Sequence, residues 1–169
     1  MMSIEKIVAT LEKLEKMHKS LLELAIAKTE YIKLGDMEKL DQQIKNEQAH
    51  VAAIDTLEQQ RQLMVTDYLR AKGIAFTDIP TVAELIEAAE DSESKEALAS
   101  VRNRLVDLLG KLKTQNDLNQ KMVFNSLQFV NITLDSMRPQ RQNQQFNYSG
   151  AEVRGNSEVA RKSFNEFKA

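Results

Sequence analysis

Cysteine and tryptophan are absent from this 169-residue sequence, and it holds only 5 glycines and 2 prolines. Without cysteine, neither a disulfide framework nor a thiolate metal site is possible. A chain this poor in glycine and proline, and rich in Ala, Glu, Lys, Leu and Gln, is typical of long helices rather than of sheets. We therefore predict an all-α fold: a long antiparallel helical hairpin or three-helix bundle with coiled-coil-like packing, one short connecting helix and a flexible C-terminal tail.

An excess of charge of either sign is also missing. The 23 Lys and Arg residues nearly balance the 25 Asp and Glu residues, which gives a net charge of -2. Mixed charge of this kind is typical of solvated helix faces and lacks the basic footprint of a nucleic-acid-binding protein. The first residues contain no apolar run before Glu5, so we expect neither a secretory signal nor membrane insertion and predict a cytoplasmic protein.

Catalytic motifs are a further absence. The sequence has no GxGxxG, no P-loop, no HExxH and no Ser/His/Asp or Cys/His arrangement, so we expect no enzyme activity and no cofactor. The two histidines are His18 and His50. Because His18 falls on the apolar seam of the first expected helix, we interpret it as a hydrogen-bonded packing residue and predict no metal site. The function must then lie in surfaces.

The expected organisation is a helical bundle over residues 1–137, followed by a polar, mobile tail over residues 138–169. Apolar residues at helical spacing, separated by short breaks, define the helices of the bundle. We predict four helices, over about 3–34, 37–71, 81–89 and 95–137.

The first helix carries the clearest packing pattern. Its apolar residues recur at the alternating 3-4 spacing that two-helix packing uses, and Ser3 is placed to cap its first turn. This seam comprises Ile4, Ile7, Leu11, Leu14, His18, Leu21 and Ala25.

Three local signals separate the helices. Gly35 can adopt the left-handed conformation that ends a helix, and Asp36 can cap the next one, which predicts a tight turn between antiparallel helices. One continuous helix through Gly35 remains an alternative, because a lone glycine costs a helix only about 1 kcal/mol. Gly73 should end the second helix, and Thr81 with Glu84 forms a capping box for the short one.

The second and third long helices differ in how far their apolar patterns persist. In the second, we expect Arg61 to cover apolar surface with its stem while its head reaches water. The apolar stripe of this helix comprises Leu40, Ile44, Val51, Ile54, Leu57, Met64 and Tyr68. In the third, a clean seam from Leu98 to Leu112 turns polar at Gln115, Asn116, Asp117, Asn119 and Gln120. This change indicates that the helix extends past its neighbours there or lies in a wet, adjustable contact.

After that polar gap, residues 122–137 are apolar around most of the helix. A helix of this kind must be buried over most of its circumference. Either the stretch lies inside its own bundle, or one side packs internally and another binds a partner. We favour the second interpretation. The candidate partner-binding residues, here called the distal apolar set, are Met122, Val123, Phe124, Leu127, Phe129, Val130, Ile132, Leu134 and Met137.

The expected tail begins at Arg138 and Pro139, where proline must end the helix. Residues 138–169 contain eight Asn or Gln residues, six Lys or Arg and three Glu, and four of the chain's nine aromatics. So many aromatics are unusual for an inert solvating segment. We interpret the tail as mobile and able to order on its own surface or on a partner's.

The sequence resembles the FlgN-type flagellar type III export chaperones. The resemblance covers about residues 4–137 and consists of helical motifs in a common order. They are Leu21-Leu22, Glu30, Leu34, Gly35-Asp36-Met37-Glu38-Lys39-Leu40, Lys45, Leu57-Glu58, Arg61, Asn119 and Asn125-Ser126-Leu127-Gln128-Phe129-Val130.

The resemblance implies a cytoplasmic, non-enzymatic protein that binds the hook–filament junction proteins, the hook-associated proteins FlgK and FlgL, before their export. Helix-in-groove recognition would serve to cover the helical ends of such substrates reversibly. The resemblance also implies docking on the export gate, FlhA, through an aromatic residue near the C-terminus, for which Tyr148 and its companion Phe146 are the candidates. Folding of both aromatics back onto the bundle is the alternative.

A rival interpretation comes from another class of protein. In a structural coiled coil or homo-oligomerisation module, the distal apolar set would be buried against a second copy of this chain. The two interpretations differ in stoichiometry, because a chaperone should form a one-to-one complex with its substrate and a scaffold should remain a concentration-dependent homo-oligomer.

Overall fold

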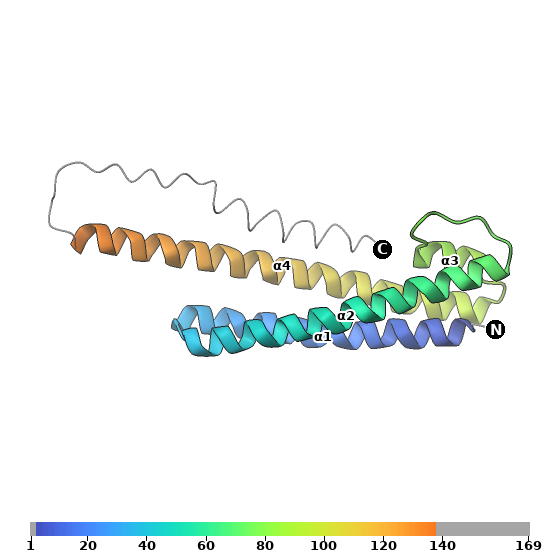
Figure 1. The fold of residues 1–169 in the computed structure, drawn as a ribbon, viewed down its shortest axis with the longest axis horizontal. Helices are drawn as coiled ribbons and strands as arrows, with labels where there is room; N and C mark the ends of the chain where they lie inside the picture. The colour runs from blue at the N-terminus through green and yellow to red at the C-terminus, as the bar shows by residue number, and fades with distance from the viewer. Residues whose placement is uncertain (1–2, 138–169) are drawn as a thin grey trace. The chain divides into compact units, whose positions relative to one another are not determined.

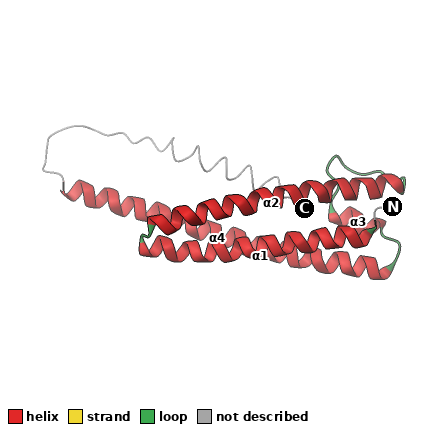
Figure 2. Cartoon of the chain, turned by 60° about the horizontal axis from the view of Figure 1, so that its bottom comes forward, coloured by secondary structure: helices red, strands yellow, loops and turns green. Residues whose placement is uncertain are grey.

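The computed structural model of this protein describes residues 3–137. The expected tail, with Phe146 and Tyr148, lies outside the described residues. Within them the chain forms four helices and no strand (Figures 1 and 2): α1 (Ile4–Leu34), α2 (Met37–Ala71), α3 (Val82–Ala88) and α4 (Ser92–Met137). The all-α prediction is confirmed. The chain divides into a first unit, Met1–Phe129, and a second unit, Val130–Ala169.

In the first unit, α1 and α2 form an antiparallel hairpin (Figure 1). Gly35 lies in the left-handed region with φ of 66°, and its N–H donates to the Ile32 carbonyl. The Asp36 carboxylate then accepts from the Lys39 N–H at 3.1 Å, which caps α2. The break at Gly35 and the cap at Asp36 are confirmed, so the continuous-helix alternative is wrong.

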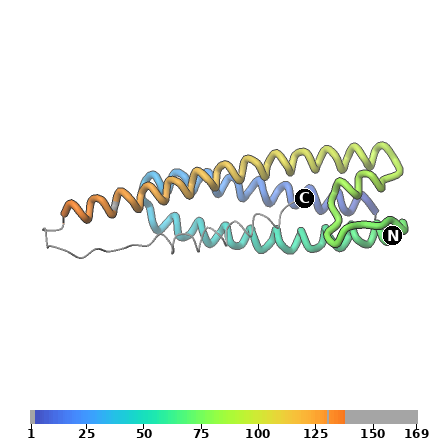
Figure 3. The backbone as a smooth tube through the Cα atoms, turned by 90° about the horizontal axis from the view of Figure 1, so that it is seen from above, coloured from blue at the N-terminus to red at the C-terminus, as the bar shows by residue number. Residues whose placement is uncertain are grey.

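α4 lies along α1 and runs in the same direction. Arg104 Nε donates to a Glu15 carboxylate oxygen at 3.0 Å, and further along both helices Asn119 Nδ2 donates to the Ala25 carbonyl at 2.8 Å. Residue numbers rise together in the two pairs, so the helices are parallel. In Figure 3 the tubes of α1, α2 and α4 run side by side. The hairpin and α4 therefore make a three-helix bundle.

The helix ends follow local capping chemistry, with two departures from the sequence prediction. The Thr81–Glu84 capping box is present at the start of α3. α4 begins at Ser92 instead of near residue 95, because the Asp91 carboxylate accepts from the Ser94 N–H at 2.9 Å and closes its first turn. Ser3 occupies the cap position of α1 in extended conformation, but its side chain makes no capping hydrogen bond, so that expectation was wrong.

The apolar core of the first unit gathers where α3 joins the bundle. We call this end the closed end. α3 packs on α2 there, and in Figure 3 it lies between α2 and α4. Each apolar side chain buried in this core contributes about 1.5–3 kcal/mol to the stability of the fold. The core residues here, each no more than 4% exposed, are Ile7, Leu11, Leu14, Val65, Leu69, Val82, Leu85, Leu98 and Val101.

The end that holds the α1–α2 turn, here called the open end, is joined by polar groups instead. Lys28 of α1 pairs with Glu47 of α2 at 3.2 Å. Gln43 is buried, and its Nε2 donates to the Leu24 carbonyl at 2.8 Å. The predicted burial of Ile44 and Val51 is wrong, because both are exposed, and at the level of Ile44 it is Gln43 that lies against α1.

The predicted exposure of the Arg61 head group is also wrong. Its guanidinium does not reach water: the side chain is 5% exposed and binds the Glu58 carboxylate. It also lies 3.5 Å from the Pro80 carbonyl, just before α3. A buried cation must be paired and hydrogen-bonded, and these two acceptors supply that. Arg61 thus joins α2 to the segment that leads into α3.

Candidate partner-binding surface

The site begins at a buried polar cluster between α1 and α4. Asn119, only 3% exposed, donates to the Ala25 carbonyl at 2.8 Å and accepts from the Thr29 hydroxyl. Gln115 donates to the same hydroxyl. The sequence interpretation of this stretch as overhanging or wet is therefore wrong, since Asn119 and Gln115 replace aliphatic packing with hydrogen bonds to α1. A buried Asn of this kind can fix the register of two helices at some cost in stability.

Beyond this cluster α4 leaves α1 behind. Asn119 is level with Ala25 and Thr29, and α1 ends at Leu34, five residues after Thr29. Both helices advance 1.5 Å per residue, so α4 passes the end of α1 between about residues 124 and 128. The last residues of α4 in the first unit therefore have no α1 beside them.

The distal apolar residues in the first unit are consequently open to solvent. The side chain of Met122 is half-buried, Val123 is 37% exposed and Phe124 47%, while Leu127 and Phe129 are 59% and 69% exposed. Their burial inside the bundle, one of the two alternatives for this stretch, is contradicted. Monomeric proteins rarely expose contiguous apolar patches larger than a few hundred Å², and such patches mark interaction sites.

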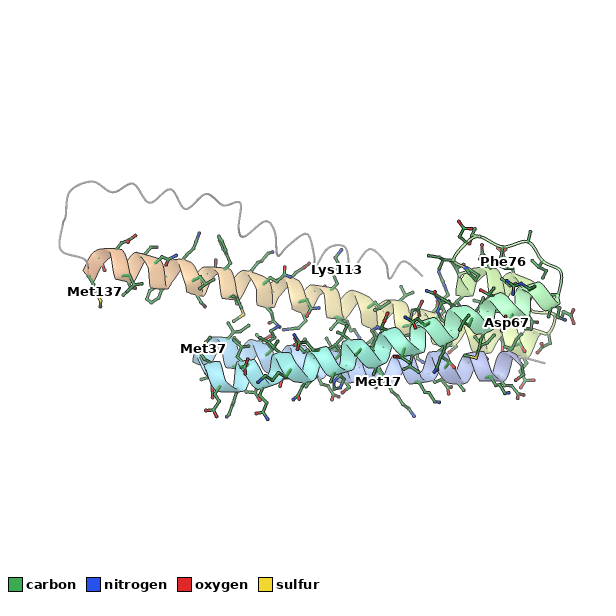
Figure 4. The ribbon with its side chains drawn as sticks, viewed as in Figure 1. Met17, Met37, Asp67, Phe76, Lys113 and Met137 are labelled. Carbon is green, nitrogen blue, oxygen red and sulfur yellow. The ribbon has the colours of Figure 1, made fainter. Side chains whose placement is uncertain are left out.

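In the second unit, α4 continues to Met137, which Figure 4 labels at the last turn. Ile132, Leu134 and Met137 are 68%, 49% and 74% exposed. Val130 belongs to α4, but its side chain is not among those that the structure describes. The members of the distal apolar set in this unit are thus also solvent-facing wherever their side chains are described.

The surface suits apolar contacts rather than acid–base chemistry. No charged residue occurs between Lys121 and Asp135. The Ser126 hydroxyl donates to the Met122 carbonyl at 2.8 Å, so this polar group is satisfied within the helix. A partner that covered this stretch would desolvate no charge of α4, and binding would come from buried apolar area.

The histidines lie away from this surface. His18 is 5% exposed and its Nδ1 lies 2.7 Å from the Leu14 carbonyl, as expected of a packing residue. Burial lowers the pKa of His18 below 6.5, and the Leu14 hydrogen bond and the charge of Glu58 offset part of that shift. Across residues 3–137, no three His, Asp or Glu side chains gather as metal ligands would.

Sequence reasoning missed a second group of exposed apolar residues. It includes Ile44 and Val51 of α2, which are 37% and 46% exposed, and the turn residues Leu34 and Met37, which are above 70%. Figure 4 labels Met37 at the start of α2. Helical spacing could not predict this exposure, because it indicates that an apolar stripe is covered but does not show where the covering helix ends.

An uncharged apolar helix face in solvent is typical of a bundle that binds other proteins. Among known proteins, a family model described as FlgN protein matches residues 1–152. The chain belongs to the FlgN family, whose members are flagellar export chaperones that bind flagellar proteins and are not known as enzymes. The resemblance stated from the sequence is thereby confirmed.

The comparisons also found a curated relative and no structural counterpart. An uncharacterized protein of Bacillus subtilis strain 168, YvyG, is 32% identical over 148 residues, which cover 88% of each chain. No solved structure matches. None of the helices between residues 3 and 137 is long and apolar enough to cross a membrane.

Proposed function

We propose that this protein is a cytoplasmic export chaperone that binds the hook-associated proteins FlgK and FlgL through the distal apolar set and delivers them to the flagellar type III export apparatus. The observation that carries the proposal is the uncharged apolar face that α4 presents to solvent beyond residue 121. Family membership supplies the flagellar context.

The chemistry of this face suits a reversible helical partner. Amphipathic helices bind by laying an apolar row against an exposed apolar surface. Met122 and Met137 stand at the two limits of the set, and unbranched thioether side chains repack easily against different partners. One surface can therefore accept two related substrates.

Delivery involves a second contact in this proposal. Tyr148, with Phe146 beside it, docks on the export gate FlhA while the substrate occupies α4. Both residues lie outside the described residues, and the support for this role is the family of the chain. Tyr148→Ala should therefore reduce export and leave substrate binding unchanged.

The first test is size-exclusion chromatography with light scattering, on this protein alone and mixed with FlgK or FlgL from the same source. A one-to-one complex is expected. Leu127→Asp should abolish it, because an unpaired charge would enter a dry contact. Val106→Asp is the matched control, since Val106 is an exposed apolar residue of α4 at 50% exposure, outside the set.

Two results would overturn the proposal. One is the absence of any complex together with a homodimer that Leu127→Asp dissociates, which would instead make α4 a self-association surface. The other is equal loss of binding in Leu127→Asp and Val106→Asp with both variants folded by circular dichroism, which would mean that binding does not depend on the distal apolar set.

A further inference from the structure

Ile44 and Val51 of α2 share one row with a fully buried residue. Seven residues make almost two helical turns, so Ile44, Val51, Glu58 and Val65 form one row that drifts about 20° around the helix at each step. Val65 is 0% exposed, whereas Val51 and Ile44 are 46% and 37% exposed. The same row is therefore covered at the closed end and bare at the open end.

At the closed end α3 packs on α2 close to Val65, since Arg61, one turn before Val65, lies 3.5 Å from the carbonyl of Pro80 just ahead of α3. In Figure 3 this helix lies between α2 and α4. Its Val82 and Leu85 are 4% and 0% exposed. α3 has only seven residues, which corresponds to a length of about 10 Å. It therefore reaches only one end of the α2 row.

Ile44, at the outer end of the bare part of the row, lies near the level where the distal apolar set starts, and Val51 lies about 10 Å further toward the closed end. Gln43 binds the Leu24 carbonyl and Asn119 binds the Ala25 carbonyl, so both residues stand beside the same turn of α1. Ile44 follows Gln43 directly, and Val123 lies about one turn beyond Asn119. Exposed apolar residues of α2 and α4 thus occur at the same end of the first unit.

We propose that a helical segment of the export substrate continues the row that α3 begins, lying over Ile44 and Val51 of α2 and against Val123 and Leu127 of α4. This inference rests on the proposed function and specifies its partner: one amphipathic helix whose apolar residues recur at i, i+3 and i+7, as do Val82 and Leu85 of α3 and Ala89, the residue that follows it. Continuity with the α2–α3 packing identifies the occupant as a helix.

The polar surroundings of the row fit an apolar occupant. Glu47 beside it pairs with Lys28, and Glu58 within it pairs with Arg61. The backbone groups along α2 are bonded within the helix, so the row offers side-chain packing and no edge for an extended strand. An apolar helix laid there would leave neither of these two acids without its partner.

The test measures binding of full-length FlgK from the same source by isothermal titration calorimetry. Ile44→Asp and Val51→Asp should each weaken binding by about tenfold or more, because an unpaired charge would be buried in the contact. Leu63→Asp is the matched control: Leu63 is an exposed apolar residue of α2, 64% exposed, that lies on a different face. Its effect should stay within about twofold, since exposed sites away from a contact change little.

A photoreactive amino acid at position 51 gives a second measurement that does not depend on a charge. It should crosslink to FlgK, and the same amino acid at position 63 should not. Normal affinity of Ile44→Asp and Val51→Asp, with no crosslink from position 51, would overturn this inference; loss of binding in Leu127→Asp would then leave the proposed function standing. If the wild-type protein fails to bind FlgK, both are wrong.

The oligomeric state tests the other possible occupant of the row, which is a second copy of this chain. A homodimer by light scattering that Val51→Asp converts to a monomer, with unchanged affinity for FlgK, would assign the row to self-association and overturn the inference. A monomer in both variants, with weakened FlgK binding, is the result expected.

Discussion

The closed end and the open end of the first unit use the same three long helices in opposite ways. At the closed end, apolar side chains such as Ile7, Leu85 and Leu98 point inward and are fully buried. At the open end, buried positions go to Gln43, Thr29 and Asn119, and apolar residues face solvent. Apolar burial is thus concentrated at the closed end, and exposed apolar surface at the open end.

The two ends differ in whether α3 is present. α3 has only seven residues and packs on α2 at the closed end. Where α3 is present, the bundle completes an apolar core; where it is absent, polar contacts hold α1 to α2 and α4. Hydrogen bonds contribute less net stability than apolar burial but specify geometry, so the open end keeps its register while its apolar residues remain available.

The largest expected effect compares the truncation of a buried leucine at the closed end with that of an exposed leucine of α4. Leu98→Ala should lower the free energy of unfolding by about 2–5 kcal/mol, since it removes a fully buried side chain and leaves a cavity. Leu127→Ala should change it by less than about 0.5 kcal/mol, because its side chain is mostly in solvent. Urea denaturation followed by circular dichroism measures both. Similar losses in the two variants would remove the distinction between the ends.

The next effect tests the polar cluster. Asn119→Ala should cost about 1–3 kcal/mol, because the Thr29 hydroxyl loses its Asn119 acceptor and the buried Ala25 carbonyl loses its Asn119 donor. Replacing both sides, as Thr29→Val with Asn119→Leu, should recover most of that loss, since apolar groups of similar shape need no hydrogen bonds. A double-mutant cycle of Thr29→Val, Asn119→Leu and the variant with both, measured by urea denaturation, provides the comparison. If the double variant loses the sum of both single losses, the cluster is not a coupled unit.

A smaller effect tests the turn at the open end. Gly35→Ala should destabilise by about 1 kcal/mol, because alanine is strained at a left-handed φ of 66°. Gly110→Ala is the control, since an added Cβ there meets nothing within 4 Å and Gly110 lies inside a helix. That variant should stabilise by about 0.5–1 kcal/mol. Thermal unfolding followed by circular dichroism compares the two, and a stabilising Gly35→Ala would contradict the turn geometry.

The smallest effect concerns pH. Burial lowers the pKa of His18 below its usual 6.5, so the unfolded chain takes up a proton at higher pH than the folded one. The stability that neutral His18 supports is then complete above pH 6.5 and is lost as the pH falls below it. Urea midpoints at pH 7.5 and 5.5 should differ more for the wild type than for His18→Gln. Equal differences would show that His18 makes no contribution to the pH dependence.

Much of the fold was predictable because its signals are local. The turn at Gly35, the cap at Asp36 and the capping box at Thr81 depend on a few neighbouring residues. The candidate surface was also found from the sequence, because nine large apolar residues in 122–137 exceed what one helical stripe can bury. The role of these residues in substrate binding stays a prediction.

What the sequence by itself determined is therefore the helices, their breaks, the packing histidine and an apolar segment at the end of α4. Tertiary structure alone decided which apolar rows are covered. Ile44 and Val51 carry the same spacing as buried residues, and Asn119 carries the appearance of an exposed one, yet their environments are reversed. The reason is physical. The spacing of a residue in the sequence specifies the helix face on which it lies, whereas its burial depends on whether another helix reaches that level of the bundle.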